Sequence, residues 1–136
     1  MVFLCNSEFN ENLHEYQKYF DQFKFPLSNF QKWSIYSIIT GNHSLVTAHT
    51  GSGKTLPAEF SITYFKTLNK KVIYTGPVKA LCNQKLYDFR LKFPDISFGI
   101  LTGDIKDNPE ADVLIMTTEV LRNALINNNI LLNNQN

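Results

Sequence analysis

The sequence has few cysteines, and its two thiols stand far apart. Cys5 and Cys82 cannot make the dense disulfide framework of a small secreted protein, so we expect both to be reduced. None of the three histidines falls at metal-ligand spacing with either cysteine, and the sequence therefore predicts no zinc site. Reduced thiols favour an intracellular protein, either cytoplasmic or nuclear.

Long apolar runs and a large excess of charge are also missing. No stretch approaches the roughly 18 apolar residues that predict a membrane span, and the N-terminus turns polar too soon for a signal peptide. The 13 basic and 12 acidic residues give a net charge of +1, so a nucleic-acid-binding surface would need local clustering of charge. Frequent asparagine and lysine suggest an A+T-rich genome, which is compatible with a viral source.

What the chain does have is an alternation of two hydrophobic periods. Short apolar runs at residues 44–48, 72–75, 96–101 and 112–116 predict strands, the last of them buried on both faces. Helical spacing over residues 11–23, 28–40, 54–68, 78–92 and 117–126 predicts the helices between them. In the last two helices we expect these residues to face the core: Leu81, Leu86, Phe89, Leu91, Val120, Leu121, Leu125 and Ile126. The alternation predicts an α/β fold with a parallel sheet, preceded by an N-terminal helical segment.

The stretch from Ala48 to Thr55 carries the clearest chemistry. A strand, a glycine-rich turn and a helix form the setting in which Gly-Lys-Thr binds nucleotide phosphates. We expect Lys54 to contact the β- and γ-phosphates and Thr55 to ligate Mg²⁺, so both are the catalytic candidates of an ATP site. The candidate ATP-binding residues of the loop are Ala48, His49, Thr50, Gly51, Ser52, Gly53, Lys54 and Thr55. Ala48 departs from the general pattern, which has glycine there.

Four further stretches resemble superfamily 2 helicases. Residues 25–31, Phe-Pro-Leu-Ser-Asn-Phe-Gln, resemble the glutamine-containing motif, and Gln31 precedes Lys54 by 23 residues. The resemblance implies that Gln31 reads adenine and that Phe25 stacks on the base. Without the family, a solvent-facing amide is the simpler interpretation of Gln31.

Residues 74–85, 101–104 and 116–122 resemble, in order, motif Ia, the Thr-Gly-Asp segment and the next nucleic-acid motif of that superfamily. The ordered set is most similar to the Ski-type DExH-box RNA helicases, the group that feeds RNA to the exosome. The resemblance implies a P-loop NTPase domain of RecA-like fold that is incomplete. It divides the chain into an extension at 1–24, a partial helicase domain at 25–126 and an asparagine-rich tail at 127–136.

The resemblance also implies a partner, RNA that is single-stranded or carries an overhang, and an association with RNA-decay machinery. Helix N-termini and small hydroxyls bind phosphates without reading bases, as such a surface requires. The implied RNA contacts are Pro77, Lys79, Gly103, Asp104, Thr117, Thr118 and Arg122. The simpler alternative for each charged side chain is a solvated surface.

Two features separate the chain from a complete motor. The sequence contains no Asp-Glu-x-His or Asp-Glu-Ala-Asp box and no second lobe with arginine fingers, so we expect weak ATP binding and little hydrolysis by this chain alone. Gly51-Ser52 also stands where the Ski-type group more often has Ser-Ala. Two alternatives remain open: a small P-loop phosphotransferase, and a non-catalytic RNA-binding remnant of a helicase.

Overall fold

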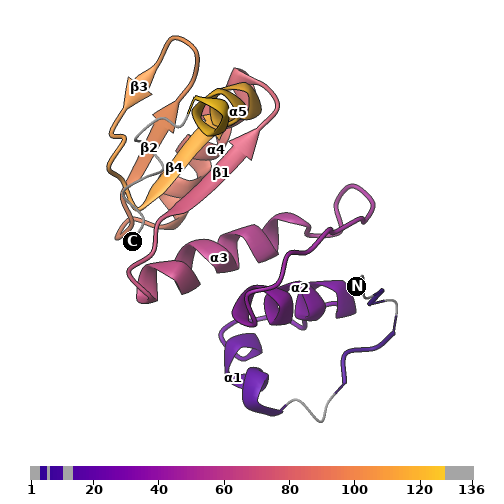
Figure 1. Ribbon diagram of the computed structural model, residues 1–136. Coiled ribbons are helices and arrows are strands. Elements are labelled where there is room, and N and C mark those ends of the chain that lie inside the picture. The colour runs from indigo at the N-terminus through magenta and orange to yellow at the C-terminus, as the bar shows by residue number, and fades with distance from the viewer. Residues whose placement is uncertain (1–3, 6, 11–13, 128–136) are drawn as a thin grey trace. The chain divides into compact units, whose positions relative to one another are not determined.

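The computed structural model describes residues 4–5, 7–10 and 14–127 (Figure 1). Within these residues helices and strands are mixed from residue 55 onward, as in an α/β fold, although three strands follow one another before the last helix. In chain order the elements are η1 (His14–Tyr16), α1 (Gln17–Phe20), α2 (Asn29–Ile39), α3 (Thr55–Thr67), β1 (Val72–Gly76), α4 (Lys79–Lys92), β2 (Phe98–Leu101), β3 (Lys106–Asp107), β4 (Val113–Thr117) and α5 (Thr118–Ile126).

The chain divides into two compact units, Met1–Thr63 and Tyr64–Asn136, and the boundary falls within α3. Each unit is described by itself below. The phosphate loop belongs to the first unit and the sheet belongs to the second.

The first unit is built around aromatic rings. Phe9 is buried and makes edge contacts with Phe20 and Trp33, at ring centroid distances of 5.2 and 4.8 Å. The predicted helix over 11–23 is wrong at its C-terminal end, since α1 stops at Phe20. Its aromatic residues pack in a cluster and not along one long stripe, and Phe23 lies next to Phe25 instead. Residues 11–13 of that prediction lie outside the described residues.

α2 begins and ends close to its predicted bounds. The Ser28 side chain and the Gln31 side chain form a reciprocal capping box at its N-terminus, which satisfies backbone donors that the helix itself leaves free. Ile35 is fully buried on its inner face.

The predicted strand at residues 44–48 is wrong. These residues form no strand within the described part of the chain, and Leu45 is 91% exposed. A strand forms only where its backbone N–H and C=O groups find partners in a neighbouring strand. An apolar run alone does not supply that neighbour.

The second unit contains a four-stranded sheet in the order β1-β4-β2-β3. β1, β4 and β2 are parallel, with Val72 and Phe98 both aligned with Val113, while β3 is antiparallel to β2. β3 lies between two of the predicted strands, in a segment for which the sequence predicts no strand because both residues of β3 are polar. The parallel part of the sheet confirms the predicted fold class.

α4 and α5 cover opposite faces of this sheet (Figure 1). Leu114 and Met116 of β4 pack with residues of α5, whereas Phe98 of β2 contacts Phe89 of α4. Alternate residues of a strand point to opposite faces, so this division follows from the register. β4 is buried on both faces, as its continuous apolar sequence predicts.

The predicted core face of the last two long helices is partly wrong. In α4 the buried side chains are Cys82 and Phe89, two helical turns apart, while Leu81 and Leu91 are exposed. In α5, Val120 and Leu121 do pack on the core, but Leu125 and Ile126 are exposed, and the small Ala124 is buried in their place.

Candidate nucleotide and nucleic-acid site

The phosphate loop turns at two glycines with left-handed backbone. Gly51 has φ +84° and Gly53 has φ +83°, values that residues with a Cβ rarely adopt. The loop is closed by a hydrogen bond of 3.3 Å from the Ser52 amide to the His49 carbonyl. The Ser52 hydroxyl is buried, and it is the one such side-chain oxygen without a hydrogen-bond partner among the described residues.

Lys54 folds back over the loop. Its Nζ donates hydrogen bonds of 2.6 Å to the carbonyls of Ala48 and His49, which places the ammonium group beside the curl of the backbone. Thr55 is the first residue of α3, so its hydroxyl stands at the positive end of that helix. Pro57 is the third residue of α3, where a missing N–H costs little because the helix has no acceptor for it. The Lys54 ammonium, the N-terminus of α3 and the Ser52 hydroxyl, which has no partner within the described chain, together suit a polyphosphate and its metal ion.

Gln31 is buried, with 6% of its surface exposed, so the solvent-facing interpretation is wrong. Its Oε1 accepts a hydrogen bond of 3.0 Å from the Ser28 amide, and its Nε2 donates one of 3.2 Å to the Gly53 carbonyl. A Cβ on Gly53 would lie 2.6 Å from that Nε2. Gln31 therefore ties the start of α2 to the phosphate loop. Phe25 is 53% exposed, and its ring centroid lies 5.9 Å from that of Phe23.

In the second unit, three motif segments meet at the carboxyl edge of the parallel strands. Each segment follows a strand directly: Pro77 follows β1, Thr102 follows β2, and Thr118 follows β4. The Thr118 hydroxyl donates a hydrogen bond of 3.1 Å to the carbonyl of Gly76, which joins the ends of β1 and β4. Neither α4 nor α5 has a side-chain cap at its N-terminus. Their first amides therefore remain available to an anion.

Lys79 and Asp104 join two of these segments through an ion pair. Lys79 is the first residue of α4, and its ammonium binds Oδ2 of Asp104, while Oδ1 of Asp104 accepts a hydrogen bond of 2.9 Å from Thr102. The hydrogen bond from Lys79, followed by the one from Thr102, holds the pKa of Asp104 below its ordinary value. Thr102 belongs to the Thr-Gly-Asp segment, but the sequence did not predict it as a site residue. Its spacing of two residues from an aspartate could have indicated this turn.

The remaining predicted contacts lie in the same three motif segments. Pro77 and Arg122 are exposed, and Thr117 occupies the N-cap position of α5 with an extended backbone. Gly103 has no other atom within 4 Å of an added Cβ, and its φ is not positive, so nothing in this fold requires glycine there. A glycine that neither the packing nor the backbone conformation of the protein requires suits the close approach of another molecule.

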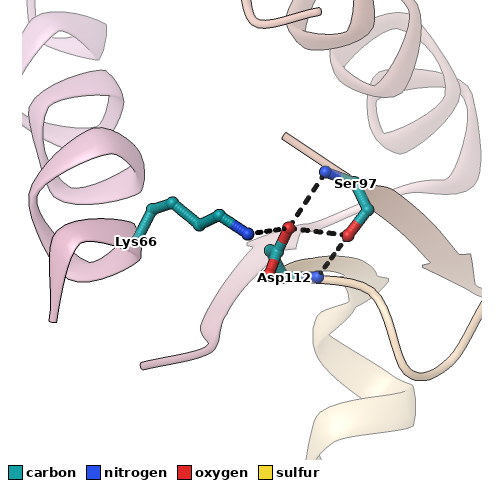
Figure 2. A network of polar contacts seen from close by, with 3 residues as sticks. All are labelled: Lys66, Ser97 and Asp112. Carbon is teal, nitrogen blue, oxygen red and sulfur yellow. Dashed lines mark hydrogen bonds and ion pairs between the residues drawn. The ribbon is translucent and has the colours of Figure 1, made fainter. Parts of the chain in front are cut away.

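The opposite, amino edge of the sheet carries a polar cluster that is not part of these motifs (Figure 2). Oδ2 of Asp112 accepts hydrogen bonds from the Ser97 amide at 3.1 Å and from the Ser97 hydroxyl at 2.8 Å, and it forms an ion pair of 2.7 Å with Lys66. The hydrogen bond from Lys66 is the largest influence lowering the pKa of Asp112. The cluster fixes the starts of β2 and β4, which is a structural role.

Metal sites and membrane-spanning helices are two further classes of feature, and the described residues contain neither. None of their histidine, cysteine, aspartate and glutamate side chains gather into a group that would hold a metal ion. In the same part of the chain, the helices are too short or too polar to cross a bilayer.

Comparison with known families bears on one of the open alternatives, the phosphotransferase. The family model of the DEAD/DEAH box helicases matches residues 28–135, which is most of the chain. The chain belongs to the DEAD/DEAH box helicase family. This assignment confirms the family inferred from the motifs, and it leaves a phosphotransferase without support. A phosphotransferase lid would need arginines, and Arg90, one of the two arginines in the sequence, is engaged with the Phe98 carbonyl and with Asp107.

Individual relatives come from the Ski-type group. The chain is 48% identical over 101 residues to the antiviral helicase SKI2 of Saccharomyces cerevisiae, which covers 74% of this chain and 8% of that protein. It is 46% identical over 104 residues to the human superkiller complex protein 2, covering 76% and 8% of the two chains. The ATP-dependent RNA helicase mtr4 of Schizosaccharomyces pombe is 44% identical over 103 residues, covering 76% and 9%. The chain thus spans less than a tenth of the length of these relatives.

Proposed function

We propose that this chain is the ATP-binding part of an ATP-dependent RNA helicase that couples ATP hydrolysis to unwinding of RNA or translocation along it. The observation that carries the proposal is the convergence of three motif segments at one edge of the sheet, joined by the Lys79–Asp104 and Thr118–Gly76 contacts. Relatives named as RNA helicases support RNA as the nucleic acid.

The phosphate loop would hold ATP. Lys54 would exchange the carbonyls of Ala48 and His49 for phosphate oxygens, while the backbone from Thr50 to Gly53 would supply amides. The hydroxyl of Thr55 would ligate Mg²⁺, which neutralises phosphate charge when bound. Gln31 would couple a movement of the loop to α2, because it hydrogen-bonds to both. Phe25 would lie beside the adenine base.

The carboxyl edge of the second unit would hold the RNA backbone. The uncapped N-termini of α4 and α5 offer amides, while Lys79 and Arg122 offer positive charge. Contacts of this kind bind phosphates without reading the base sequence, which suits an enzyme that moves along any RNA. An intracellular setting, cytoplasmic or nuclear, and a partner in RNA decay belong to the same proposal.

The test uses two lysine variants of the 136-residue chain with a matched control. Binding of a fluorescent ATP analogue and of a labelled single-stranded RNA would be measured by anisotropy at several salt concentrations. Lys54→Ala should lose nucleotide binding and keep RNA binding, while Lys79→Ala should do the reverse and lower the salt slope by up to about 0.7. Lys70→Ala is the control, because Lys70 is exposed and precedes β1 at the opposite edge of the sheet.

Two outcomes would count against the proposal, and a third would count against the expected lack of hydrolysis. Equal effects of Lys79→Ala and Lys70→Ala on RNA would mean that only net charge matters. RNA binding that is indifferent to ATP would favour a non-catalytic remnant. RNA-stimulated ATP turnover by this chain alone would contradict the expectation that it cannot hydrolyse ATP without an Asp-Glu box.

A further inference from the structure

The Lys79–Asp104 pair contains a contradiction for a phosphate-binding surface. Asp104 lies in a segment expected to face RNA, yet its carboxylate would repel a phosphate. The Asp104 carboxylate forms an ion pair with the ammonium of Lys79. Lys79 is the first residue of a 14-residue helix whose N-terminus has no side-chain cap. An anion at that position is stabilised both by the lysine and by the helix dipole.

We propose that Asp104 is an internal anion that occupies the phosphate position at Lys79, so that a nucleic-acid backbone binds there only by displacing it. The inference rests on the proposed RNA-binding function and assigns to Asp104 the opposite role from a direct contact. It makes Asp104 a determinant of specificity, since each incoming anion must first compete with a carboxylate that is already attached.

The carboxylate is held in place independently of Lys79. Thr102 is buried, with 8% of its surface exposed, and its hydroxyl donates to Oδ1 of Asp104 while it accepts a hydrogen bond of 3.2 Å from the Ile105 amide. The Thr102 amide donates in turn to the Ile105 carbonyl at 2.8 Å. The turn therefore presents Asp104 to Lys79 at a high effective concentration.

The pair is nevertheless at the surface, so it can be exchanged. The Lys79 side chain is 44% exposed and the Asp104 side chain is 64% exposed. Ion pairs in such positions are weak because water and salt screen them. Gly103, beside Asp104, leaves open space into which a backbone phosphate can approach.

The consequence is selection for strands over isolated anions. Inorganic phosphate or a mononucleotide gains one contact when it displaces Asp104. A nucleic-acid strand meets the same competition once but also gains contacts at neighbouring phosphates. The surface should therefore resist small anions at cellular concentrations and still bind RNA.

The test removes the charge of Asp104 and keeps its shape. We expect Asp104→Asn to bind labelled single-stranded RNA roughly two- to five-fold more tightly, the range that a surface ion pair represents. The log–log salt slope should steepen by less than about 0.7, because Asp104 no longer offsets the phosphate neutralisation by Lys79 that releases counterions from the RNA. Inorganic phosphate should also inhibit RNA binding at a lower concentration than in the wild type.

Three further variants separate this role from others. Asp107→Asn is the matched control, since Asp107 is a 58% exposed carboxylate that pairs with Arg90 and does not contact Lys79. Asp104→Glu keeps the charge and should bind RNA much as the wild type does. In a Lys79→Ala background, Asp104→Asn should give little gain, because there is no ammonium left to release.

Several results would overturn the proposal. Unchanged or weaker RNA binding by Asp104→Asn, with an unchanged circular dichroism spectrum, would mean that Asp104 contacts RNA or only shapes the turn. A gain that persists without Lys79, or that Asp107→Asn reproduces, would mean general charge repulsion. If the wild type binds RNA and Asp104→Asn shows no gain, this proposal alone fails; if no variant binds RNA, the proposed function fails with it.

Discussion

Replacing Asp112 with alanine removes the acceptor at the centre of the cluster in Figure 2. Oδ2 of Asp112 receives hydrogen bonds from the amide and the hydroxyl of Ser97 and an ion pair from Lys66. The Asp112 carbonyl also accepts a hydrogen bond of 2.9 Å from the Val72 amide, so the residue stands where β1, β2 and β4 all begin. Loss of its side chain should loosen the amino edge of the sheet.

The expected loss of stability is moderate. Hydrogen bonds to a charged acceptor contribute about 1.5–3 kcal/mol when they are shielded, and an exposed ion pair contributes about 0.2–1 kcal/mol. The Asp112 and Lys66 side chains are 31% and 44% exposed, so water replaces part of what is lost. We expect the free energy of unfolding to fall by about 1–2 kcal/mol in Asp112→Ala and by no more than about 1 kcal/mol in Lys66→Ala.

Urea unfolding followed by circular dichroism measures this loss. With a slope of roughly 2 kcal/mol per molar urea, the midpoint of Asp112→Ala should fall by about 0.5–1 M. Amide hydrogen exchange should rise in peptides that contain β2 and β4. Asp95→Ala is the control, because Asp95 is an exposed carboxylate near the same edge. A midpoint for Asp112→Ala equal to that of Asp95→Ala, or a larger loss in Lys66→Ala, would refute the reasoning.

Two other predictions concern pH and the phosphate loop. Lys66 holds the pKa of Asp112 below its ordinary value of 3.8, so the cluster should stabilise the fold fully above about pH 4 and lose that contribution as pH falls through the lower folded pKa. At low pH the urea midpoint of the wild type should therefore approach that of Asp112→Ala. A difference between the two midpoints that stays constant down to about pH 2 would contradict this prediction. Gly53→Ala should strain a backbone at φ +83° by about 1–3 kcal/mol, crowd Gln31 and abolish binding of a fluorescent ATP analogue. Gly103→Ala is the control and should fold and bind ATP normally. Equal ATP binding by the two variants would disprove the steric argument.

The sequence predicts this fold best where one period dominates over many residues. β4 is a continuous apolar run, and α2 has a capping residue, Ser28, with Gln31 three positions later, so both were found close to their bounds. β3 escaped prediction because its two residues, Lys106 and Asp107, pair through the backbone and carry no apolar signal.

The failures have a common physical cause, which is dependence on distant partners. Residues 44–48 have the composition of a strand, but the described chain provides no neighbour to pair with them. Leu81 and Leu91 have the side chains of core residues, but the sheet surface selects Cys82 and Phe89. The local sequence shows which side chains of a segment could be buried, but it does not show which other segments will pack against them.

The candidate site shows the same division. The phosphate loop was predictable because its glycines, lysine and threonine are adjacent in the sequence. The ion pair between Lys79 and Asp104 joins residues 25 positions apart, and the link from Thr118 to Gly76 spans 42 positions. The motifs named most of these residues, but only the packing of the strands brings them into contact.

The cluster at Asp112 and the motif segments lie at opposite ends of the same strands. Five residues of β4 separate Asp112 from Thr118, a distance of roughly 15–20 Å along an extended chain. A dye attached at the exposed Asp95 would therefore sit far enough from the motif segments to leave binding undisturbed, yet close enough for energy transfer to a labelled RNA. The separation of the two edges gives this small chain a natural attachment point for an optical reporter of strand binding.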